Sequence, residues 1–355
     1  MTEDQKLAAL ALQTHQEVIF DSMVEGLLLL DERGRIQLAN RAFLALFGLA
    51  AEPRGRTIIE AVRQHELAAL VKSLETQRQV LGYELKLPGL NERWLQINAA
   101  AIFDDRGERH GTVLVFHDLT RLKQLESARQ EFVANVSHEL RTPLSLIKGY
   151  AETLLDGARN NPEVATRFLQ TIDRNAERLK LLIEDLLTIS ELESGRVTLN
   201  LQAISLPQVV GKVIEDFKER AAARGATLVN HAPEVAVRAD MNRLEQVLGN
   251  LVDNAIKYGR PKGTVIIGGQ PRDNGQVEMF VQDDGPGIPP EALERVFERF
   301  YRVDKARSRE QGGTGLGLAI VKHLVQSHGG RVWATSEPGQ GATFFLLLKQ
   351  DPGAA

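Results

Sequence analysis

The chain has 355 residues, a length that allows two to three domains of ~100–200 residues each. Hydrophobic residues make up 43% and charged residues 25%, which is the composition of an ordinary soluble globular protein. The formal net charge of −4 gives no indication of nucleic acid or an anionic membrane as a partner, and the absence of cysteine excludes disulfides and thiolate metal sites.

No stretch of the sequence approaches the ~18 consecutive apolar residues that a transmembrane helix requires, and the N-terminus lacks the pattern of a signal peptide. We therefore expect a cytoplasmic protein with no transmembrane segment in this chain. The sequence leaves open whether a membrane-spanning segment precedes it in a longer protein.

The first third of the chain has the pattern of a small α+β domain. Residues 1–25 carry apolar residues at helical spacing, so a helix is expected there. Alternating apolar residues and turn sequences then predict two strands, two helical segments and three strands. In chain order these are strands 27–30 and 35–39, a helix capped by Asn40, a helix over 58–74, and strands 80–87, 93–103 and 111–117.

This order of elements resembles the PAS family over residues 16–118, with residues 1–15 as a preceding helix. The segment from Arg33 to Phe43 resembles the family's first hairpin and helix, and Asp118-Leu119-Thr120 resembles its exit motif. An unrelated small α+β domain is the alternative. The resemblance implies a sensor domain, but a fold does not identify a ligand, and the domain could equally serve dimerisation.

A long helix is expected to follow, since no Gly or Pro occurs between Leu119 and Pro143. It should end near Asp156–Gly157, and Asn160-Asn161-Pro162 should form a loop before a second helix over 163–193. Apolar residues of the second helix alternate at spacings of three and four, interrupted by Asn175 and widened by Ile183 and Leu187. The seam consists of Phe168, Ile172, Leu179, Leu182, Leu186 and Ile189.

A helical hairpin with so broad an apolar face cannot bury that face alone. Dimerisation into a four-helix bundle is the economical solution, which predicts a homodimer. Packing against the next domain of the same chain is the alternative.

One stretch of the first long helix carries a candidate reactive side chain. Between Phe132 and Leu144, apolar residues recur at helical spacing and form one stripe. His138 lies outside that stripe and is followed by Glu139, and Thr142 lies one helical turn further on the same side. A lone histidine on a helix is usually a surface residue, so its role depends on the rest of the chain.

The last part of the chain, residues 204–349, has the pattern of an α/β sandwich with one sheet and helices on one face. Residues 350–355 remain as a tail. The expected elements are helix 206–224, strands 227–232 and 235–239, helix 242–258, strands 265–270 and 277–282, helix 316–328, and strands 332–336 and 343–348.

Separated polar and glycine-rich patches in this domain suit a nucleotide. Amide and ammonium groups along one helix suit Mg²⁺ and phosphate, a carboxylate after a strand suits an exocyclic amine, and a glycine loop before a helix makes an anion site. A polar segment, residues 303–311, has the composition of a mobile lid. The patch residues are Asn250, Asn254, Lys257 and Tyr258; Asp283, Gly285, Gly287 and Ile288; Arg302; Gly313, Thr314, Gly315, Leu316 and Gly317; and Thr343 in a final hairpin.

In this order, the patches resemble the N, G1, F, G2 and G3 boxes of the sensor histidine kinases, and the stretch from Phe132 to Leu144 resembles their H box. The resemblance covers residues 16–349 and looks most like the phosphate-sensor subgroup. It implies that residues 119–195 form a signalling helix with a dimerisation and phosphotransfer domain, and that residues 204–349 form an ATP-binding domain of the histidine kinase, gyrase and chaperone type. The implied cofactors are ATP and Mg²⁺, and the implied partner is the receiver domain of a response regulator.

The same resemblance implies a role for each motif residue. His138 would be the phosphoacceptor, Glu139 the general base, and Thr142 would help to position a water that dephosphorylates the partner. In the ATP domain, Asp283 would bind adenine, Asn250 would hold Mg²⁺, and Arg302 would reach the γ-phosphate. Asn254 and Lys257 would contact phosphates, Tyr258 would stack near the base, and the glycine-box residues would complete the nucleotide site.

Two other functions remain as alternatives at this stage. An ATPase of the chaperone, gyrase or mismatch-repair class would share the ATP fold but would not need the His138-Glu139 element. A PAS-bearing interaction protein with a decayed kinase domain would not need intact asparagines, Asp283 and glycines. Both alternatives therefore leave part of the sequence pattern unexplained.

Overall fold

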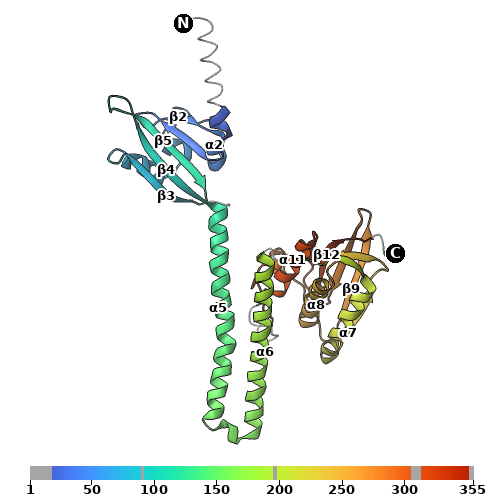
Figure 1. Cartoon of the computed structure of the whole chain (residues 1–355). Helices are drawn as coiled ribbons and strands as arrows, with labels where there is room; N and C mark the ends of the chain where they lie inside the picture. The colour runs from blue at the N-terminus through green and yellow to red at the C-terminus, as the bar shows by residue number, and fades with distance from the viewer. Residues whose placement is uncertain (1–17, 89–91, 195–197, 305–312, 352–355) are drawn as a thin grey trace. The chain divides into compact units, whose positions relative to one another are not determined.

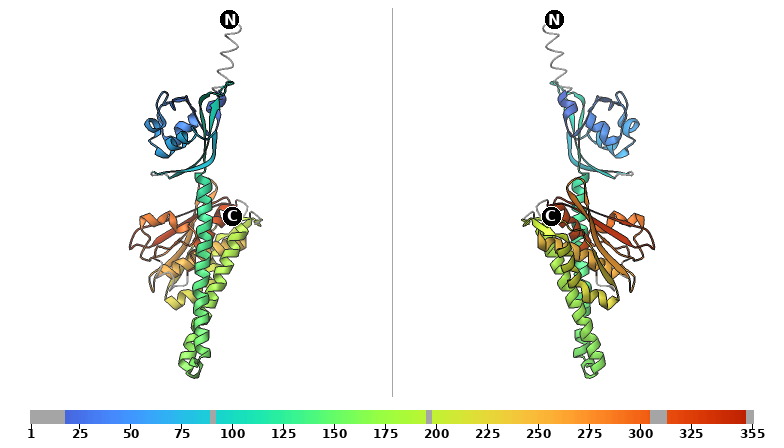
Figure 2. Two further views of the ribbon diagram at one scale, coloured as in Figure 1. Left: turned by 90° about the vertical axis from the view of Figure 1, so that its left-hand side faces the viewer. Right: turned by 90° about the vertical axis from the view of Figure 1, so that its right-hand side faces the viewer.

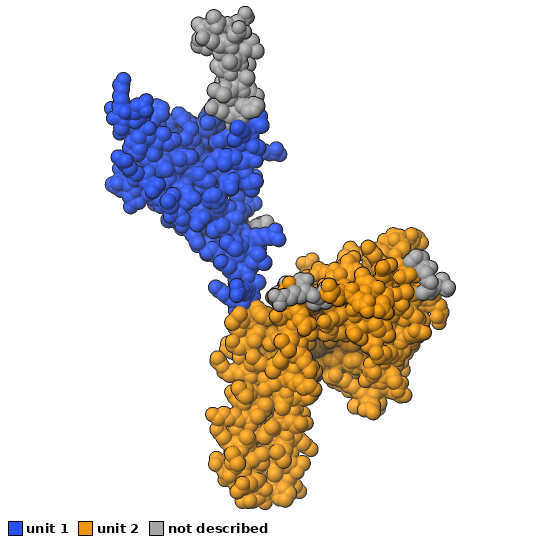
Figure 3. Space-filling view, viewed as in Figure 1, with its two compact units in different colours: residues 1–131 blue, residues 132–355 orange. Residues whose placement is uncertain are grey.

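The structure of the protein is a computed structural model (Figure 1), and it describes four stretches of the chain: residues 18–88, 92–194, 198–304 and 313–351. Two compact units divide the chain, residues 1–131 and residues 132–355 (Figure 3). Within the described stretches, no helix is both long and apolar enough to cross a membrane.

The first unit contains a five-stranded antiparallel sheet with the strand order β2-β1-β5-β4-β3. Its strands are β1 (Gly26–Leu30), β2 (Ile36–Ala39), β3 (Gln79–Leu87), β4 (Arg93–Phe103) and β5 (Arg109–Asp118). Short helices lie on one face of this sheet (Figure 2), namely α2 (Arg41–Phe47), α3 (Ile58–Val62) and α4 (His65–Ser73). This arrangement confirms the α+β fold expected of a PAS domain. Of the helix predicted over 1–25, residues 1–17 lie outside the described stretches, and residues 18–22 are helical.

Asn40 explains why α2 begins where it does. Its side chain is fully buried, and its Oδ1 accepts hydrogen bonds from the backbone N–H groups of Phe43 at 2.9 Å and Leu27 at 2.8 Å. The predicted cap therefore also fixes the start of β1 against the helix. The aromatic ring of Phe43 lies 5.2 Å from that of Phe116, so the capped helix contributes to the core of the unit.

The helix predicted over 58–74 is wrong in one respect, since the segment forms two helices. Thr57 and Glu60 form a capping box at the start of α3. Arg63 then adopts a left-handed conformation with φ of 54°, which ends α3 before α4 begins at His65. The spacing of apolar residues does not reveal a single residue with left-handed backbone conformation, so the break between the two helices was not predicted.

Two long antiparallel helices, α5 (Thr120–Leu155) and α6 (Pro162–Glu193), form the predicted hairpin, with the short helix η1 (Ala158–Asn160) between them. Asn161 caps α6, because its side chain accepts from the backbone N–H groups of Glu163 and Val164. Pro143 is buried inside α5 and does not end it. Near the loop, the rings of Tyr150 and Phe168 lie 4.9 Å apart and join the two helices.

The apolar seam of α6 divides between two surfaces. Leu182 and Ile189 are only 2% and 1% exposed, and they belong to the same buried cluster as the core of the ATP domain. For this end of the seam, the alternative prediction of packing against the next domain of the same chain is correct. A dimer is not needed to explain the burial of these two residues. Ile183 and Leu187 are 48% and 60% exposed, so no part of the chain that the structure describes covers the widened side of the face.

The C-terminal part of the second unit is an α/β domain built on a five-stranded sheet with the order β11-β12-β10-β9-β7. Strands β7 and β9 pair in parallel and the other pairs are antiparallel. The strands are β7 (Thr227–His231), β9 (Thr264–Arg272), β10 (Gln276–Gln282), β11 (Arg331–Ser336) and β12 (Ala342–Lys349). The main helices are α7 (Leu206–Arg224), α8 (Met241–Tyr258) and α11 (Gly317–Ser327), and the shorter α9 (Pro290–Leu293) and η2 (Arg295–Phe297) follow β10.

The prediction that all strands of this domain share one sheet is wrong for one strand. The strand β8 (Ala236–Ala239) pairs with β6 (Gln202–Ser205) in a separate two-stranded sheet. Residues 202–205 pair with β8 along their whole length, although their sequence lacks the alternation of apolar and polar residues that is typical of a strand. Pairing with a partner that lies over thirty residues away in sequence leaves little local signal.

Candidate active site

A cavity of about 300 Å³ opens in the α/β domain, and it collects patches that are far apart in the sequence. It is lined from α8, from the turn after β10, from residues 301–304 and from the glycine loop before α11, with further residues from α6. Twelve of the predicted nucleotide residues line it: Asn250, Asn254, Lys257, Tyr258, Asp283, Gly287, Ile288, Arg302, Gly313, Thr314, Gly315 and Gly317.

Three predicted residues, Gly285, Leu316 and Thr343, are not among the lining residues. Gly285 and Leu316 are buried, and both donate backbone N–H groups to side chains that do line the cavity. Thr343 lies on β12 between Ala342 and Phe344, which do line it. These three residues support the wall of the cavity from behind.

Amphipathic packing of α8 turns its polar residues toward the cavity. Val247 and Leu251 are 1% and 0% exposed and face the core, whereas Asn250 and Asn254 line the cavity on the other side. The Asn250 amide Nδ2 donates to the carbonyl oxygen of Gly317 at 3.3 Å, which leaves the amide oxygen free to act as a ligand. The asparagine thus joins α8 to the start of α11.

Asp283 follows β10 and is held by its own domain. Its side chain is 7% exposed, and its Oδ1 accepts from the backbone N–H groups of Gly285 at 2.8 Å and Ala342 at 3.3 Å. Burial raises the pKa of the Asp283 carboxyl above its usual range, and the two backbone donors oppose that effect. Both donors use Oδ1, so Oδ2 can accept a hydrogen bond from a ligand in the cavity.

Gly341 keeps the backbone close to Asp283. Its φ is 88°, and a Cβ built on it would lie 2.0 Å from the carbonyl oxygen of Asp283. Any other residue would therefore strain the backbone and push β12 away from the carboxylate. Within the stretch Gly339–Phe344, Gly341 is therefore the glycine that this close approach requires.

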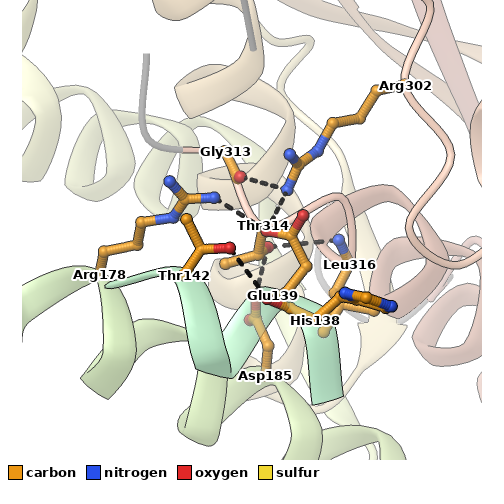
Figure 4. A network of polar contacts seen from close by, with 9 residues as sticks. All are labelled: His138, Glu139, Thr142, Arg178, Asp185, Arg302, Gly313, Thr314 and Leu316. Carbon is orange, nitrogen blue, oxygen red and sulfur yellow. Dashed lines mark hydrogen bonds and ion pairs between the residues drawn. The ribbon is translucent and has the colours of Figure 1, made fainter. Parts of the chain in front are cut away.

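Arg302 joins the cavity to α5, as Figure 4 shows. Its guanidinium donates to the Gly313 carbonyl oxygen at 2.6 Å and to Glu139 Oε2 at 3.2 Å. The same Glu139 oxygen accepts from Arg178 of α6 at 2.8 Å. Glu139 and Arg178 are each 16% exposed and Arg302 is 6% exposed, so these ion pairs are well shielded from water.

His138 itself is exposed, next to Glu139 on α5 (Figure 4). The Thr142 hydroxyl donates to the His138 backbone carbonyl at 3.1 Å, as is common one turn along a helix. At the start of the same stretch, the ring of Phe132 lies 5.8 Å from that of Phe300, close to the glycine loop. The structure therefore brings the His138 stretch and the cavity together within one unit.

Three family models match this sequence: the PAS fold over residues 14–119, the His Kinase A (phospho-acceptor) domain over residues 128–195, and the histidine kinase-, DNA gyrase B- and HSP90-like ATPase over residues 239–352. Among curated proteins, a sensor protein kinase WalK of Staphylococcus aureus is 34% identical over 339 residues, covering 93% of this chain and 79% of that protein. The chain belongs to the sensor histidine kinases.

Other curated relatives of this kinase are longer. WalK of Staphylococcus aureus strain Newman is 35% identical over 339 residues, which cover 93% of this chain but 54% of that protein, so the chain spans about half the length of such relatives. Among solved structures, the histidine kinase AdeS of Acinetobacter baumannii is 27% identical, covers 60% of this chain and 98% of that chain, and has a TM-score of 0.50. The histidine kinase ThkA, solved in complex with the response regulator protein TrrA, is 24% identical, covers 95% of this chain and 99% of that chain with a TM-score of 0.52, and shows the same fold.

Sequence reasoning missed two site residues of this kinase, Arg178 and Asp185 of α6. Arg178 binds Glu139, and the Asp185 Oδ2 accepts from the Thr314 hydroxyl at 2.7 Å (Figure 4). The two residues are seven positions apart and so share one face of α6, which is a signal that could have been noticed. That spacing does not indicate which face of α6 meets the ATP domain.

The predicted lid falls largely outside the described residues, since residues 305–312 are not described. Val303 and Asp304 at its start do line the cavity. Leu181, Asp253 and Tyr301 also line it and were not predicted. Lys257 forms an ion pair with Asp253 at 2.7 Å, which orients its ammonium group along the wall.

Proposed function

We propose that this histidine kinase binds ATP with Mg²⁺ in the cavity of its α/β domain and transfers the γ-phosphoryl group to His138. The phosphoryl group then passes to an aspartate in the receiver domain of a response regulator. One observation carries the proposal: the asparagines of α8, Asp283, Arg302 and the glycine loop line a single cavity, and Arg302 connects that cavity to Glu139, the neighbour of His138.

The electrostatics of the cavity support a divalent cation. Among the described residues of its wall, the carboxylates are Asp185, Asp253, Asp283 and Asp304, whereas the cations are Lys257 and Arg302. A triphosphate adds further negative charge, so a cation is needed to neutralise it. Asn250 offers an amide oxygen, a hard ligand that suits Mg²⁺, and the metal would neutralise charge on the phosphates.

The nucleotide would lie along the cavity with its base at one end and its phosphates at the other. Asp283 would accept from the exocyclic amine of adenine, and Tyr258 would lie near the base. Lys257 and Asn254 would contact the phosphates, and the amides at the N-terminus of α11 would bind their oxygens. In this pose the γ-phosphate lies on the side of Arg302.

In the chemical step, an unprotonated nitrogen of the neutral His138 imidazole attacks the γ-phosphorus in line. The new N–P bond forms as the bond to the bridging oxygen of ADP breaks, and Glu139 takes the proton from the other imidazole nitrogen. In the structure the Glu139 carboxylate already accepts hydrogen bonds from two arginines, Arg178 and Arg302. Arg302 would therefore exchange Glu139 for the γ-phosphate before transfer, and a mobile ATP domain makes that exchange possible.

The reverse-sense reaction, dephosphorylation of the response regulator, would use the same helical turn. The Thr142 hydroxyl lies one turn from His138 and, while donating to a carbonyl, can still accept from a water. Glu139 would hold the same water from its other side. A response regulator as partner is supported by the family, and ThkA is an example of a histidine kinase solved with one.

The homodimer remains part of the proposal because apolar side chains of the hairpin are exposed. Their exposure ranges from 43% to 70%, in the case of Val133, Leu144, Leu146, Leu155, Leu169, Ile183 and Leu187. A second hairpin packed against these residues would remove them from water and complete a four-helix bundle. The kinship with the phosphate-sensor subgroup also stays a prediction, since the relatives named above are WalK kinases.

Labelling with γ-labelled ATP and Mg²⁺ tests the central claim. Wild-type protein should acquire acid-labile, base-stable label, and His138→Gln should acquire none. His231→Gln is the matched control, because His231 is an exposed histidine at the end of β7, away from the cavity lining. If His138→Gln is labelled as strongly as the control, His138 is not the phosphoacceptor.

A further inference from the structure

Asp185 is a carboxylate of α6 that reaches into the nucleotide cavity of a different domain. Its side chain lines the cavity together with Asn250 and Lys257. Its Oδ2 accepts a hydrogen bond of 2.7 Å from the hydroxyl of Thr314, in the glycine loop. The same hydroxyl accepts from the backbone N–H of Leu316 at 3.2 Å, so the loop itself orients the Thr314 hydroxyl (Figure 4).

The Thr314 hydroxyl can donate to only one acceptor at a time, because it carries a single proton. A phosphate oxygen at the N-terminus of α11 would compete with Asp185 for that proton. Two acceptors that compete for one hydroxyl lie within about 5.5 Å of each other, twice a typical hydrogen-bond length. At this separation two negative charges repel strongly in a partly buried site.

The surroundings of Asp185 increase this conflict. Burial raises the pKa of the Asp185 carboxyl, which indicates that its charge is poorly solvated where it lies. Lys257 offsets the charge in part, whereas Glu184 and Asp253 add to the negative potential. A phosphate that came close to Thr314 would therefore meet a carboxylate whose charge is only partly offset, unless α6 moved away.

We propose that Asp185 is a positioning residue through which α6 makes the kinase distinguish ATP from ADP. With ADP, the Asp185–Thr314 bond persists and holds the glycine loop against α6. With ATP, the γ-phosphate takes the Thr314 proton and the charge of Asp185 drives the loop away from α6. The inference rests on the proposed function, because it assumes that the phosphates bind at the start of α11.

Binding of the two nucleotides to the full chain tests this role. We would measure the Kd of ATP and of ADP with Mg²⁺ by calorimetry, in a His138→Gln background so that ATP is not consumed. Asp185→Asn keeps the size and an acceptor oxygen but removes the charge. It should tighten ATP about tenfold, which corresponds to ~1.4 kcal/mol, and change the Kd of ADP less than twofold.

Two matched variants identify the cause of such a change. Glu184→Gln removes the neighbouring negative charge from an exposed position of α6, and it should change the ratio of the two Kd values much less than Asp185→Asn does. Asp185→Glu keeps the charge and should retain the parent ratio. A ratio that does not change in Asp185→Asn, or that changes equally in Asp185→Glu, overturns the inference. If the parent protein binds neither nucleotide, the proposed function itself fails.

Discussion

The two ends of the nucleotide cavity are held in place by different parts of the chain. At one end, Asp283 is fixed by backbone N–H groups of Gly285 and Ala342, all within the α/β domain. At the other end, Arg302 and Thr314 are bonded to Glu139 and Asp185, which belong to the helical hairpin. The end proposed for the base is therefore held within its own domain, and the end proposed for the phosphates depends on how the domain lies against the hairpin.

This difference suits the two tasks of the proposed kinase. Recognition of adenine should not vary with the signalling state, since ATP must be bound before any transfer. The rate of γ-phosphoryl transfer should vary with the signalling state, because transfer is the step that a signal would control. Placing the phosphate-side contacts on residues from two domains makes the chemistry sensitive to their relative movement while the affinity for the base stays constant.

Replacing Asp283 should give the largest effect. Asp283→Asn turns a pure acceptor into a group that presents an N–H₂ to the adenine amine, so we expect ATP binding to weaken more than about 100-fold, as when a buried polar pair is mismatched. The folded domain should survive, because an amide oxygen can still accept from Gly285 and Ala342. Calorimetry with Mg-ATP measures the affinity, and circular dichroism measures the folding.

Asp284 provides the control for that variant. Its carboxylate accepts from the backbone N–H groups of Arg260 at 3.2 Å and Thr264 at 2.9 Å, and the residue is not among those lining the cavity. Asp284→Asn should therefore lower the melting temperature more than it alters the affinity for ATP. Equal loss of affinity in the two variants would mean that Asp283 acts through the fold and does not contact the base.

The contrast between the two ends also decides what the sequence could predict. Asp283, the glycines and the asparagines of α8 act within one domain, and their motifs have fixed spacing, so twelve of the predicted nucleotide residues could be placed on one cavity. Arg178 and Asp185 were missed because their contacts depend on which face of α6 meets the ATP domain. No local pattern encodes that docking.

The fold shows the same division between local and distant information. The cap at Asn40 and the bounds of the long helices follow from side chains near each boundary, and these predictions are confirmed. The break at Arg63 and the pairing of β6 with β8 were not predicted. The first depends on one left-handed residue, and the second on a partner strand distant in sequence.

An intermediate effect is expected at the phosphate end. Arg302→Gln removes the ion pair with Glu139 and the cation that would meet the γ-phosphate, so autophosphorylation should slow by about tenfold to 100-fold, with a smaller change in the Kd of ATP. Arg302→Lys keeps the charge, but its ammonium group is on a shorter side chain than the Arg302 Nη2 that donates to both Glu139 and Gly313, so it should recover only part of the rate. Single-turnover labelling of His138 measures both variants.

Arg272 is the matched control for the loss of an arginine–carboxylate pair. It bonds to Glu278 at 2.6 Å on the sheet, away from the cavity lining. Arg272→Gln should change the rate of labelling in the folded protein less than twofold, since this ion pair lies away from the cavity lining and takes no part in the chemistry. If it slows labelling as much as Arg302→Gln, the phosphate end has no special dependence on Arg302.

The smallest expected effect is the pH dependence of stability at Asp283. It is measured by comparing the melting temperatures of the wild type and Asp283→Asn. Burial raises the folded-state pKa of Asp283 above its ordinary value, so its ionised form is less favourable in the folded protein than in the unfolded chain. Stability from this group is therefore full below the unfolded pKa and is lost as pH rises toward the folded pKa. Asp283→Asn has no such loss, so its melting temperature relative to wild type should increase between pH 4 and pH 7, by no more than about 3 °C. A difference that is constant over this range, or that decreases with pH, would show that the backbone donors of Gly285 and Ala342 outweigh the burial of the charge, and that the base end stores no electrostatic strain.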